Sequence, residues 1–409
     1  MTVLSVVIPA YNEEHGIADI ARRVLEIQRP LREVGVEDLE VLVVDDGSRD
    51  GTAHRAEAVP GVRLIRHPRN AGYGAALKTG FFEAKGDLIG FLDADGTYPP
   101  EAFPQLCQVA MNGADLVIGS RMSGARSRMP LTRRVGNHFF AGLLSLLGHQ
   151  RVTDSASGMR VFRRGVLDRL YPLPDGLNLT PVMSVRAIHE GLRTAEVPIT
   201  YDERIGRSKL SVVRDGSLFL RSIIWTVLSY NPVRILGGLG LVGTGAALAV
   251  GLGLLGLRLS GVTSLGGWGI AALFAGAVAG LGGVSLFSLG ATFNYLVALL
   301  HKRPIRQGLF GRPLFNPPLE HHFGWLGAVG LAAGVLVGGV SLALGVRGWS
   351  VDRLWLYLMG SSGMILLGVQ LVIFWILLRV LDELSQRESS SDAGTSGAEA
   401  REARDGRSA

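Results

Sequence analysis

The stretch Glu40-Val41-Leu42-Val43-Val44-Asp45-Asp46-Gly47-Ser48 decides the fold of the N-terminal half, because an apolar run ends abruptly in two carboxylates and a turn. A short apolar run bounded by turn residues is typical of a buried strand. Leu88–Leu92 ends in the same way, in Asp93-Ala94-Asp95, and Val3–Ile8 ends at Pro9. Buried strands that end in polar groups are therefore the first feature of this chain.

Segments with helical spacing separate these runs. In chain order we expect strands at Val3–Ile8, Glu40–Val44, Val62–Arg66, Leu88–Leu92 and Leu116–Gly119, and helices at Glu13–Gln28, Ala71–Ala84 and Pro99–Asn112. The alternation predicts an α/β domain with a mostly parallel, Rossmann-like sheet and helices on both faces. Ligands of such sheets bind beyond the carboxyl ends of the strands. The polar clusters therefore mark the expected site.

The C-terminal half has a different composition. The 409 residues are 47% hydrophobic and only 19% charged, against about 25% charged in ordinary soluble domains. A bilayer is spanned by roughly 20 apolar residues. Four transmembrane helices are therefore expected, at about Val233–Leu257, Trp268–Leu300, Phe323–Val346 and Leu354–Leu381.

The flanking segments predict the orientation. Met1–Ala10 lacks the basic region and the apolar length of a signal peptide. Basic loops prefer the cytoplasmic side, and the loop between the second and third spans holds four basic residues and no acid before Glu320. We expect a multi-pass protein of the inner or plasma membrane, with the N-terminal domain in the cytosol.

Four regions follow from these patterns: a domain at residues 1–209, a juxtamembrane amphipathic helix at 210–231, the membrane domain at 232–381, and a tail at 382–409 that we expect to be disordered. Trp225 and Tyr230 would anchor an interfacial helix at headgroup level; a helix of the soluble core is the alternative. Glycines at small-residue spacing, such as Gly237 and Gly240, leave a homo-oligomer possible. The single Cys107 excludes an intrachain disulfide.

The acidic clusters each have two interpretations. The segment 45–52 favours a tight turn followed by a helix N-cap, which needs no ligand; alternatively, a carboxylate there accepts hydrogen bonds from a nucleotide base or ribose. Asp93 and Asp95 would repel each other unless a cation lies between them. Oxygen ligands suit Mg²⁺ or Mn²⁺ shared with a substrate phosphate.

In combination the motifs resemble family 2 glycosyltransferases of the GT-A fold, over roughly residues 3–210. The matching segments are Ser5–Glu14, Val44–Thr52, Asn70–Gly74 and Asp93–Glu101. The resemblance implies a nucleotide-sugar donor, with Asp93 and Asp95 as ligands of Mg²⁺ or Mn²⁺. The residues implied to bind the donor are Pro9, Tyr11, Glu13, Asp45, Asp46, Asp93, Ala94 and Asp95.

Three further segments resemble the polyprenyl-phosphate hexose synthases, which include dolichol-phosphate mannose synthase. They are Gly119–Arg121, Asp154–Arg160 and Glu203–Leu210, and Met159 stands where that subgroup has Phe. The resemblance implies an inverting enzyme that moves one hexose from a nucleotide sugar of the GDP-mannose or UDP-glucose type. The implied acceptor is undecaprenyl, decaprenyl or dolichyl phosphate, and nucleic acid is not an expected partner.

A phosphate acceptor is already anionic, so its attack needs positioning by cations more than it needs a base. We expect Arg121, Arg134, Ser157, Arg204 and Lys209 to bind it, with Arg134 preferred to Arg133; the alternative is that these basic residues contact anionic lipid headgroups. Asp95, Arg121 and Asp154 are the catalytic candidates. Asp154 is either a base or, as we favour, a residue that orients an arginine.

Two other functions compete with this interpretation. A processive polysaccharide synthase of the same superfamily would resemble the donor half, but its Gln-x-x-Arg-Trp motif is missing, because no tryptophan here follows an arginine. A catalytically dead membrane scaffold would have lost the acidic pair or the basic set. Both sets are present in this chain.

Overall fold

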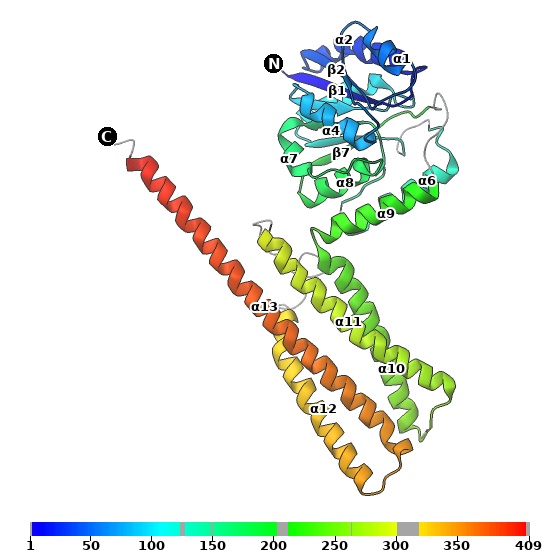
Figure 1. Ribbon diagram of the computed structural model, residues 1–409, viewed down its shortest axis with the longest axis vertical. Coiled ribbons are helices and arrows are strands. Elements are labelled where there is room, and N and C mark those ends of the chain that lie inside the picture. The colour runs from blue at the N-terminus through cyan, green and yellow to red at the C-terminus, as the bar shows by residue number, and fades with distance from the viewer. Residues whose placement is uncertain are drawn as a thin grey trace. The chain divides into compact units, whose positions relative to one another are not determined.

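The computed structural model describes residues 2–122, 127–148, 150–202, 212–262, 264–300 and 319–405. The chain divides into two compact units, Met1–Val227 and Leu228–Ala409. The first carries all the strands and the shorter helices, and the second carries four long helices (Figure 1). Each unit is described by itself below.

The first unit is built on a seven-stranded sheet with the order β3-β2-β1-β4-β6-β5-β7. All its neighbouring pairs are parallel except those of β6, which runs antiparallel to both β4 and β5. The mostly parallel GT-A sheet expected from the sequence is confirmed. The strands are β1 (Val3–Ala10), β2 (Asp38–Asp45), β3 (Val62–Arg66), β4 (Leu88–Phe91), β5 (Leu116–Ser120), β6 (Arg160–Arg163) and β7 (Thr194–Pro198).

Helices cover both faces of this sheet. Successive side chains of a strand point to opposite faces, so Val6 and Ile8 of β1 join one buried core while Val7 joins the other. Helices α1 and α5 pack into the first core, and α4 and α8 into the second. Their bounds are α1 (Ile17–Glu26), α2 (Gln28–Glu33), α3 (Thr52–Glu57), α4 (Tyr73–Glu83), α5 (Phe103–Met111), α6 (Leu131–Gly148), α7 (Leu167–Leu170), α8 (Leu179–His189) and α9 (Val212–Leu228), with short 3₁₀ turns at Pro100–Ala102 and Arg164–Val166.

The sheet register brings the polar strand ends together. Ala10 of β1 pairs with Asp45 of β2, and Val7 pairs with Phe91 of β4. The residues that follow these three strands therefore emerge at one edge of the sheet, as the sequence pattern predicts. This edge holds the site described below.

Helix α9 belongs to the first unit by its contacts. Phe219, Ile223 and Val227 are buried, whereas Trp225 is 63% exposed. The buried residues recur every four positions, which places them on one helix face. A membrane-interface contact therefore remains a prediction for the opposite face, where Trp225 lies.

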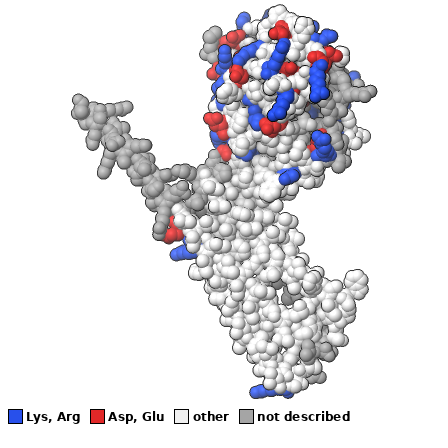
Figure 2. Space-filling view, in the orientation of Figure 1, with Lys and Arg blue, Asp and Glu red and all other residues white. Residues whose placement is uncertain are grey.

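The second unit consists of α10 (Pro232–Leu259), α11 (Gly267–Leu300), the 3₁₀ turn Leu319–His322, α12 (Phe323–Val346) and α13 (Val351–Asp405). All four helices contain stretches long and apolar enough to cross a membrane. Helix α10 packs along α11, α12 packs along α13, and α11 also contacts α13. The visible surface of these helices is nearly free of Lys, Arg, Asp and Glu (Figure 2).

The structure corrects the expectation for the C-terminal tail. Helix α13 continues past Leu381 to Asp405, where we had expected no regular structure. The tail is rich in Ala, Glu and Arg, which are strong helix formers, and it contains no proline. A helix already formed by the apolar part can therefore propagate without a new nucleation step.

Candidate active site

A cavity of about 480 Å³ lies at the carboxyl ends of β1, β2 and β4 in the first unit. Its lining includes seven of the eight residues expected to bind the donor, all but Asp45, together with Arg121. The seven donor residues that line the cavity are Pro9, Tyr11, Glu13, Asp46, Asp93, Ala94 and Asp95.

Asp46 ties the end of β2 to the loop that begins α4. Its Oδ1 accepts the backbone N–H of Ala71 at 2.9 Å, and its Oδ2 accepts that of Gly72 at 2.8 Å. His67 Nδ1 lies 2.7 Å from Asp46 Oδ1, and His67 Nε2 lies 2.9 Å from Thr79 Oγ1. His67 was not predicted from the sequence, because a lone histidine after β3 carries no recognisable spacing.

Asp45 has a different role from the one expected. Its Oδ1 accepts the Ser48 backbone N–H at 3.2 Å, and it does not line the cavity. It closes the turn, as aspartate does without any ligand. Adjacent residues at a strand end point to opposite sides, so only Asp46 of this pair reaches the cavity. The donor-binding assignment of Asp45 is not supported.

The turn after β2 and the loop after β1 hold each other in place. The Asn12 N–H donates to Ser48 Oγ at 2.9 Å, and the Arg49 N–H donates to Asn12 Oδ1 at 2.9 Å. The Glu13 N–H donates to Thr52 Oγ1 at 2.8 Å. Asn12 has φ of 51°, a left-handed conformation that asparagine tolerates. Tyr11 and Glu13 are thereby fixed at the rim of the cavity.

Asp93 and Asp95 are each oriented by a neighbouring hydroxyl. The Tyr73 hydroxyl donates to Asp93 Oδ1 at 2.8 Å, and the Thr97 hydroxyl donates to Asp95 Oδ1 at 2.6 Å. Burial, reinforced by the Asp93 charge, raises the pKa of Tyr73 well above its usual value, so this hydroxyl stays a donor. A methyl group added at Gly158 would lie 2.5 Å from Asp93 Oδ2, so a larger residue there would displace the Asp93 carboxylate.

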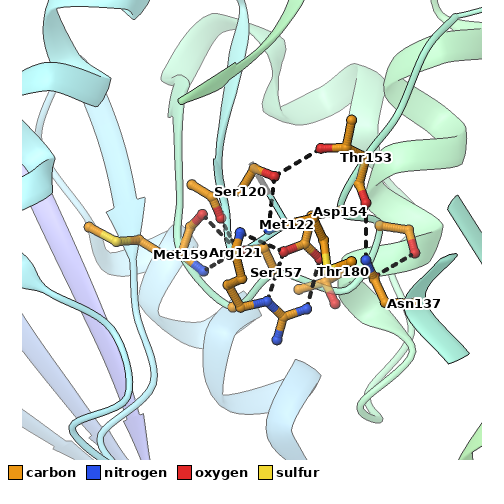
Figure 3. Close-up of polar contacts among 12 residues, drawn as sticks. Ser120, Arg121, Met122, Asn137, Thr153, Asp154, Ser157, Met159 and Thr180 are labelled. Atoms are coloured by element: carbon orange, nitrogen blue, oxygen red, sulfur yellow. Dashed lines mark hydrogen bonds and ion pairs between the residues drawn. The ribbon is translucent and has the colours of Figure 1, made fainter. Parts of the chain in front are cut away.

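Arg121 and Asp154 form a buried ion pair (Figure 3). The Arg121 Nε donates to Asp154 Oδ2 at 2.8 Å, its Nη2 donates to Oδ1 at 2.7 Å, and its backbone N–H donates to Oδ2 at 3.0 Å. Burial alone would lower the pKa of Arg121, but Tyr98 and Asp154 outweigh it and hold that pKa well above its ordinary value. Both carboxylate oxygens of Asp154 are committed to Arg121, and Asp154 does not line the cavity.

Two tyrosines complete the surroundings of Arg121. Its guanidinium carbon lies 5.3 Å from the centroid of the Tyr201 ring and 5.9 Å from that of Tyr98. Cations within about 6 Å of an aromatic face are attracted by the ring quadrupole. The backbone N–H of Gly158 donates to the Tyr98 hydroxyl at 2.7 Å. The sequence analysis identified neither tyrosine.

The guanidinium of Arg160 holds the loop from Ser155 to Arg160 in place. Arg160 is fully buried, and its guanidinium donates to the carbonyls of Ser155 and Ser157 and to Ser184 Oγ. Burial lowers the pKa of Arg160 to about 10, so the residue is still charged at neutral pH. Arginine suits this position because its planar fork serves several carbonyls at once.

Ser157 does not bind an acceptor through its side chain. The side chain is fully buried, its hydroxyl donates to the Gly119 carbonyl at 2.6 Å, and it does not line the cavity. Ala156 and Gly158 line the cavity instead. The hydroxyl of Ser157 instead satisfies the backbone of β5, which leaves acceptor binding by this side chain without support from the geometry.

The basic residues expected at the acceptor end separate into three groups. Arg121 and Arg133 line the cavity, whereas Arg134 is exposed and lies outside the lining. One residue along a helix turns the side chain by about 100°, so the geometry favours Arg133 over the Arg134 that we expected. Arg204 and Lys209 lie outside the described residues.

Apolar side chains form another part of the cavity wall. They come from the segment before α6, from α6 itself, from the loop before α8 and from α9, and the rings of Phe140 and Phe219 lie 5.9 Å apart. Local sequence patterns do not show that these segments meet, which is why the sequence analysis missed this wall. Its members are Met129, Phe140, Leu177, Leu218 and Phe219.

The chain is similar in sequence to known families and proteins. A family model described as glycosyl transferase family 2 matches residues 5–171, and one described as a domain of unknown function matches residues 232–392. The chain is 32% identical over 272 residues to the undecaprenyl-phosphate 4-deoxy-4-formamido-L-arabinose transferase of Pseudomonas fluorescens, covering 63% of this chain and 74% of that protein. It is 33% identical over 221 residues to the dolichyl-phosphate hexose transferase of Haloferax volcanii, covering 54% and 92%.

A solved structure gives a weaker likeness. Glucosyl-3-phosphoglycerate synthase from Mycobacterium tuberculosis aligns with 56% of this chain and 78% of its own, at 24% identity and a TM-score of 0.45.

The sheet, the acidic strand ends and the sequence relatives together define a glycosyltransferase. The chain belongs to glycosyltransferase family 2 and, within it, to the polyprenyl-phosphate sugar transferases. The resemblance drawn from its motifs is thereby confirmed at both levels.

Proposed function

We propose that this enzyme transfers a single hexose, with inversion, from a nucleotide sugar to a polyprenyl phosphate at the cytosolic face of the membrane. One observation carries the proposal: a single cavity is lined by the strand-end carboxylates, by Arg121 and Arg133, and by an apolar wall. A nucleotide sugar, a phosphate and the start of an isoprenoid chain need these three kinds of surface.

The donor would lie against the ends of β1, β2 and β4. Asp46 can accept hydrogen bonds from a base or ribose, because its carboxylate is already held in place by the 71–72 backbone. Asp93 and Asp95 would face the diphosphate. GDP-mannose and UDP-glucose both carry a base, a ribose and a diphosphate. A screen of nucleotide sugars therefore identifies the donor.

The residues present fit a divalent cation. Asp93 and Asp95 both line the cavity, and each is oriented by a hydroxyl. No group of three or more His, Cys, Asp or Glu side chains suited to a metal occurs among the described residues. Mg²⁺ commonly takes one or two protein carboxylates and completes its shell with phosphate oxygens and water. When bound, Mg²⁺ or Mn²⁺ would neutralise charge on the departing diphosphate.

The acceptor end needs no general base. A lipid phosphate carries its own negative charge, so the task of the protein is to hold the phosphate oxygen in line with the sugar C1. Arg121 and Arg133 supply the positive charge, and Asp154 holds the Arg121 guanidinium in one orientation. The carbon–oxygen bond to the leaving diphosphate breaks as the bond from the lipid phosphate oxygen forms, with inversion at C1.

Membranes that contain the enzyme test this proposal with a panel of radiolabelled nucleotide sugars. We expect label from at least one donor in a chloroform-soluble lipid that mild acid releases. Asp95→Ala should abolish the transfer while the protein remains folded, and chelation of divalent cations should do the same to the unaltered enzyme. Absence of lipid label with every donor would refute the proposal.

A further inference from the structure

The second unit contains the same sequence motif in two different helices. Residues 237–243 of α10 and residues 324–330 of α12 both read Gly-x-Leu-Gly-x-Val-Gly. Residues 283–286 of α11 and 368–371 of α13 both read Gly-Val-x-Leu. In the first helix pair Gly283 follows Gly240 by 43 residues, and in the second Gly368 follows Gly327 by 41 residues. The turn between α12 and α13 is three residues shorter than that between α10 and α11, and α13 begins one residue further from its motif than α11 does.

The matching glycines make the same contacts. A methyl group added at Gly240 would lie 2.5 Å from the Gly283 carbonyl and 2.6 Å from the Phe287 nitrogen. At Gly327 it would lie 2.8 Å from the Gly368 carbonyl and 3.0 Å from the nitrogen of Val372. Phe287 and Val372 each follow their motif glycine by four residues. The same close helix–helix contact therefore occurs in both helix pairs.

The correspondence continues along the helices. A methyl group at Gly243 would lie 3.0 Å from the Ala279 carbonyl, and one at Gly330 would lie 3.7 Å from that of Met364. Ala279 and Met364 each precede their motif glycine, Gly283 or Gly368, by four residues.

The preceding helical turn shows the same register. Gly290 approaches Gly237, just as Gly324 approaches Trp375. Gly290 and Trp375 each stand seven residues after the glycine of their Gly-Val-x-Leu motif. Glycine contacts are common between membrane helices, but a series of matched contacts in one constant register points to two copies of one hairpin.

The two hairpins meet through equivalent residues. Helix α11 contacts α13, and the Gln370 Nε2 donates a hydrogen bond to Ser285 Oγ. Ser285 and Gln370 both occupy the third position of the Gly-Val-x-Leu motif. In a two-fold interface a residue on the axis meets its own counterpart. Helices α10 and α12 run in the same direction (Figure 1), as in parallel repeats related by an axis along the membrane normal.

We infer that the membrane unit is a tandem repeat of one helical hairpin, α10–α11 and α12–α13. The face that carries Ser285 in one repeat and Gln370 in the other is a self-recognition surface, and its partner is the other repeat of the same chain. Lipid tails are as apolar as these helices, so the hydrophobic effect does little to drive their association. The interhelical hydrogen bond therefore contributes to their pairing. This inference is independent of the proposed substrate.

A reciprocal exchange tests the symmetry. Gln370→Ser alone removes the bond and should lower the midpoint of thermal unfolding of the full-length protein in bilayers by about 2 °C. The double variant Ser285→Gln/Gln370→Ser places the long side chain on the other repeat, and it should recover the midpoint of the unaltered protein. If the exchange is no more stable than Gln370→Ser, the two positions are not equivalent and the inference fails.

Cross-linking gives a second readout that does not depend on a small change in stability. Ser285→Cys/Gln370→Cys should form an intrachain disulfide on oxidation, detected by mass spectrometry of the digested protein. The matched control is Ser285→Cys/Ser362→Cys, with the second cysteine on an exposed position of α13. Cys107 is fully buried, and burial raises its pKa to about 12, so it stays unreactive in the folded protein. Equal yields from both pairs, or no disulfide in the first, would contradict the interface.

Discussion

Asp154 shows how a carboxylate beside an active site can serve through another residue. Both its oxygens bind Arg121, and neither residue has much access to solvent. Removing one partner of a buried pair leaves the other charge uncompensated, which costs about 3–5 kcal/mol. We therefore propose that Asp154 positions Arg121.

Asp154→Asn should accordingly lower the free energy of unfolding of the first unit by about 3 kcal/mol, together with the loss of transfer. Thermal or chemical unfolding followed by fluorescence measures this. Asp115→Asn is the matched control, since Asp115 pairs with an Arg193 that is largely exposed, and surface pairs contribute about 1 kcal/mol or less. If Asp154→Asn lost activity at unchanged stability, Asp154 would instead act directly as a base.

Arg133 and Arg134 provide a comparison between neighbours on one helix. Arg133 lines the cavity and Arg134 does not. Arg133→Ala should reduce kcat/KM for the lipid phosphate roughly 100-fold. Removal of one hydrogen-bond donor that stabilises an anion in the transition state has an effect of that size in other enzymes. Arg134→Ala should change it less than threefold. Steady-state kinetics with a short-chain polyprenyl phosphate measures both; an equal loss in the two variants would contradict the placement.

The predicted donor residues that line the cavity share one property. Pro9, Asp46, Asp93 and Asp95 lie at or directly after the ends of buried strands, and a parallel sheet brings such positions to one edge. Asp45, Ser157 and Arg134 do not line the cavity, although a residue next to each of them does. The face on which one residue falls depends on dihedral angles that a motif does not reveal.

At the scale of elements, the antiparallel strand β6 is the feature that the sequence concealed. Its four residues, Arg160–Arg163, begin and end with arginine and lack the apolar run that identified β1 to β5. Strand β7 (Thr194–Pro198) was not expected from the sequence either. It pairs with β4 and β5, so the loop that precedes it lies beside the ends of both. This insertion brings Gly158 against Asp93 and thus joins the two halves of the site.

Helix α6 carries an exposed apolar stripe that the sequence patterns did not predict. Leu131, Val135, Phe139 and Leu146 are 58–77% exposed, while Arg133 on another face lines the cavity. Apolar residues at spacings of four and seven lie on one side of a helix. We expect this stripe to contact the membrane interface, because the lipid acceptor must approach the cavity from the bilayer surface.

Val135→Asp/Phe139→Asp should therefore raise the KM for polyprenyl phosphate in liposomes about tenfold, equivalent to about 1.4 kcal/mol of lost binding. The fold should be unaffected, because both side chains are already more than half exposed. Phe82→Asp is the control: Phe82 is 82% exposed and lies on α4. An unchanged KM in the double variant, or an equal rise with Phe82→Asp, would show that the stripe does not meet the membrane.

At the scale of the whole molecule, the average composition conceals two unlike units. Of the 76 charged side chains 54 lie in the first unit, whereas the second is made of four long apolar helices. The net charge of +6 divides into +2 for the first unit and +4 for the second. Length and apolarity were enough to place those spans within a few residues. They did not show that the second pair of helices repeats the first, because the shared motifs are short and glycine is abundant in these helices. The matched contacts of the motif glycines show that the two pairs pack in the same register.

The central claim is that one cavity joins a nucleotide sugar to a lipid phosphate and adds one sugar. Purified enzyme, reconstituted with Mg²⁺ or Mn²⁺, polyprenyl phosphate and each nucleotide sugar in turn, tests it directly by mass spectrometry of the extracted lipid. The account predicts a product heavier than the acceptor by one hexose residue, and no further addition when the donor is in excess. A ladder of longer products, or an unmodified lipid with every donor, would contradict it.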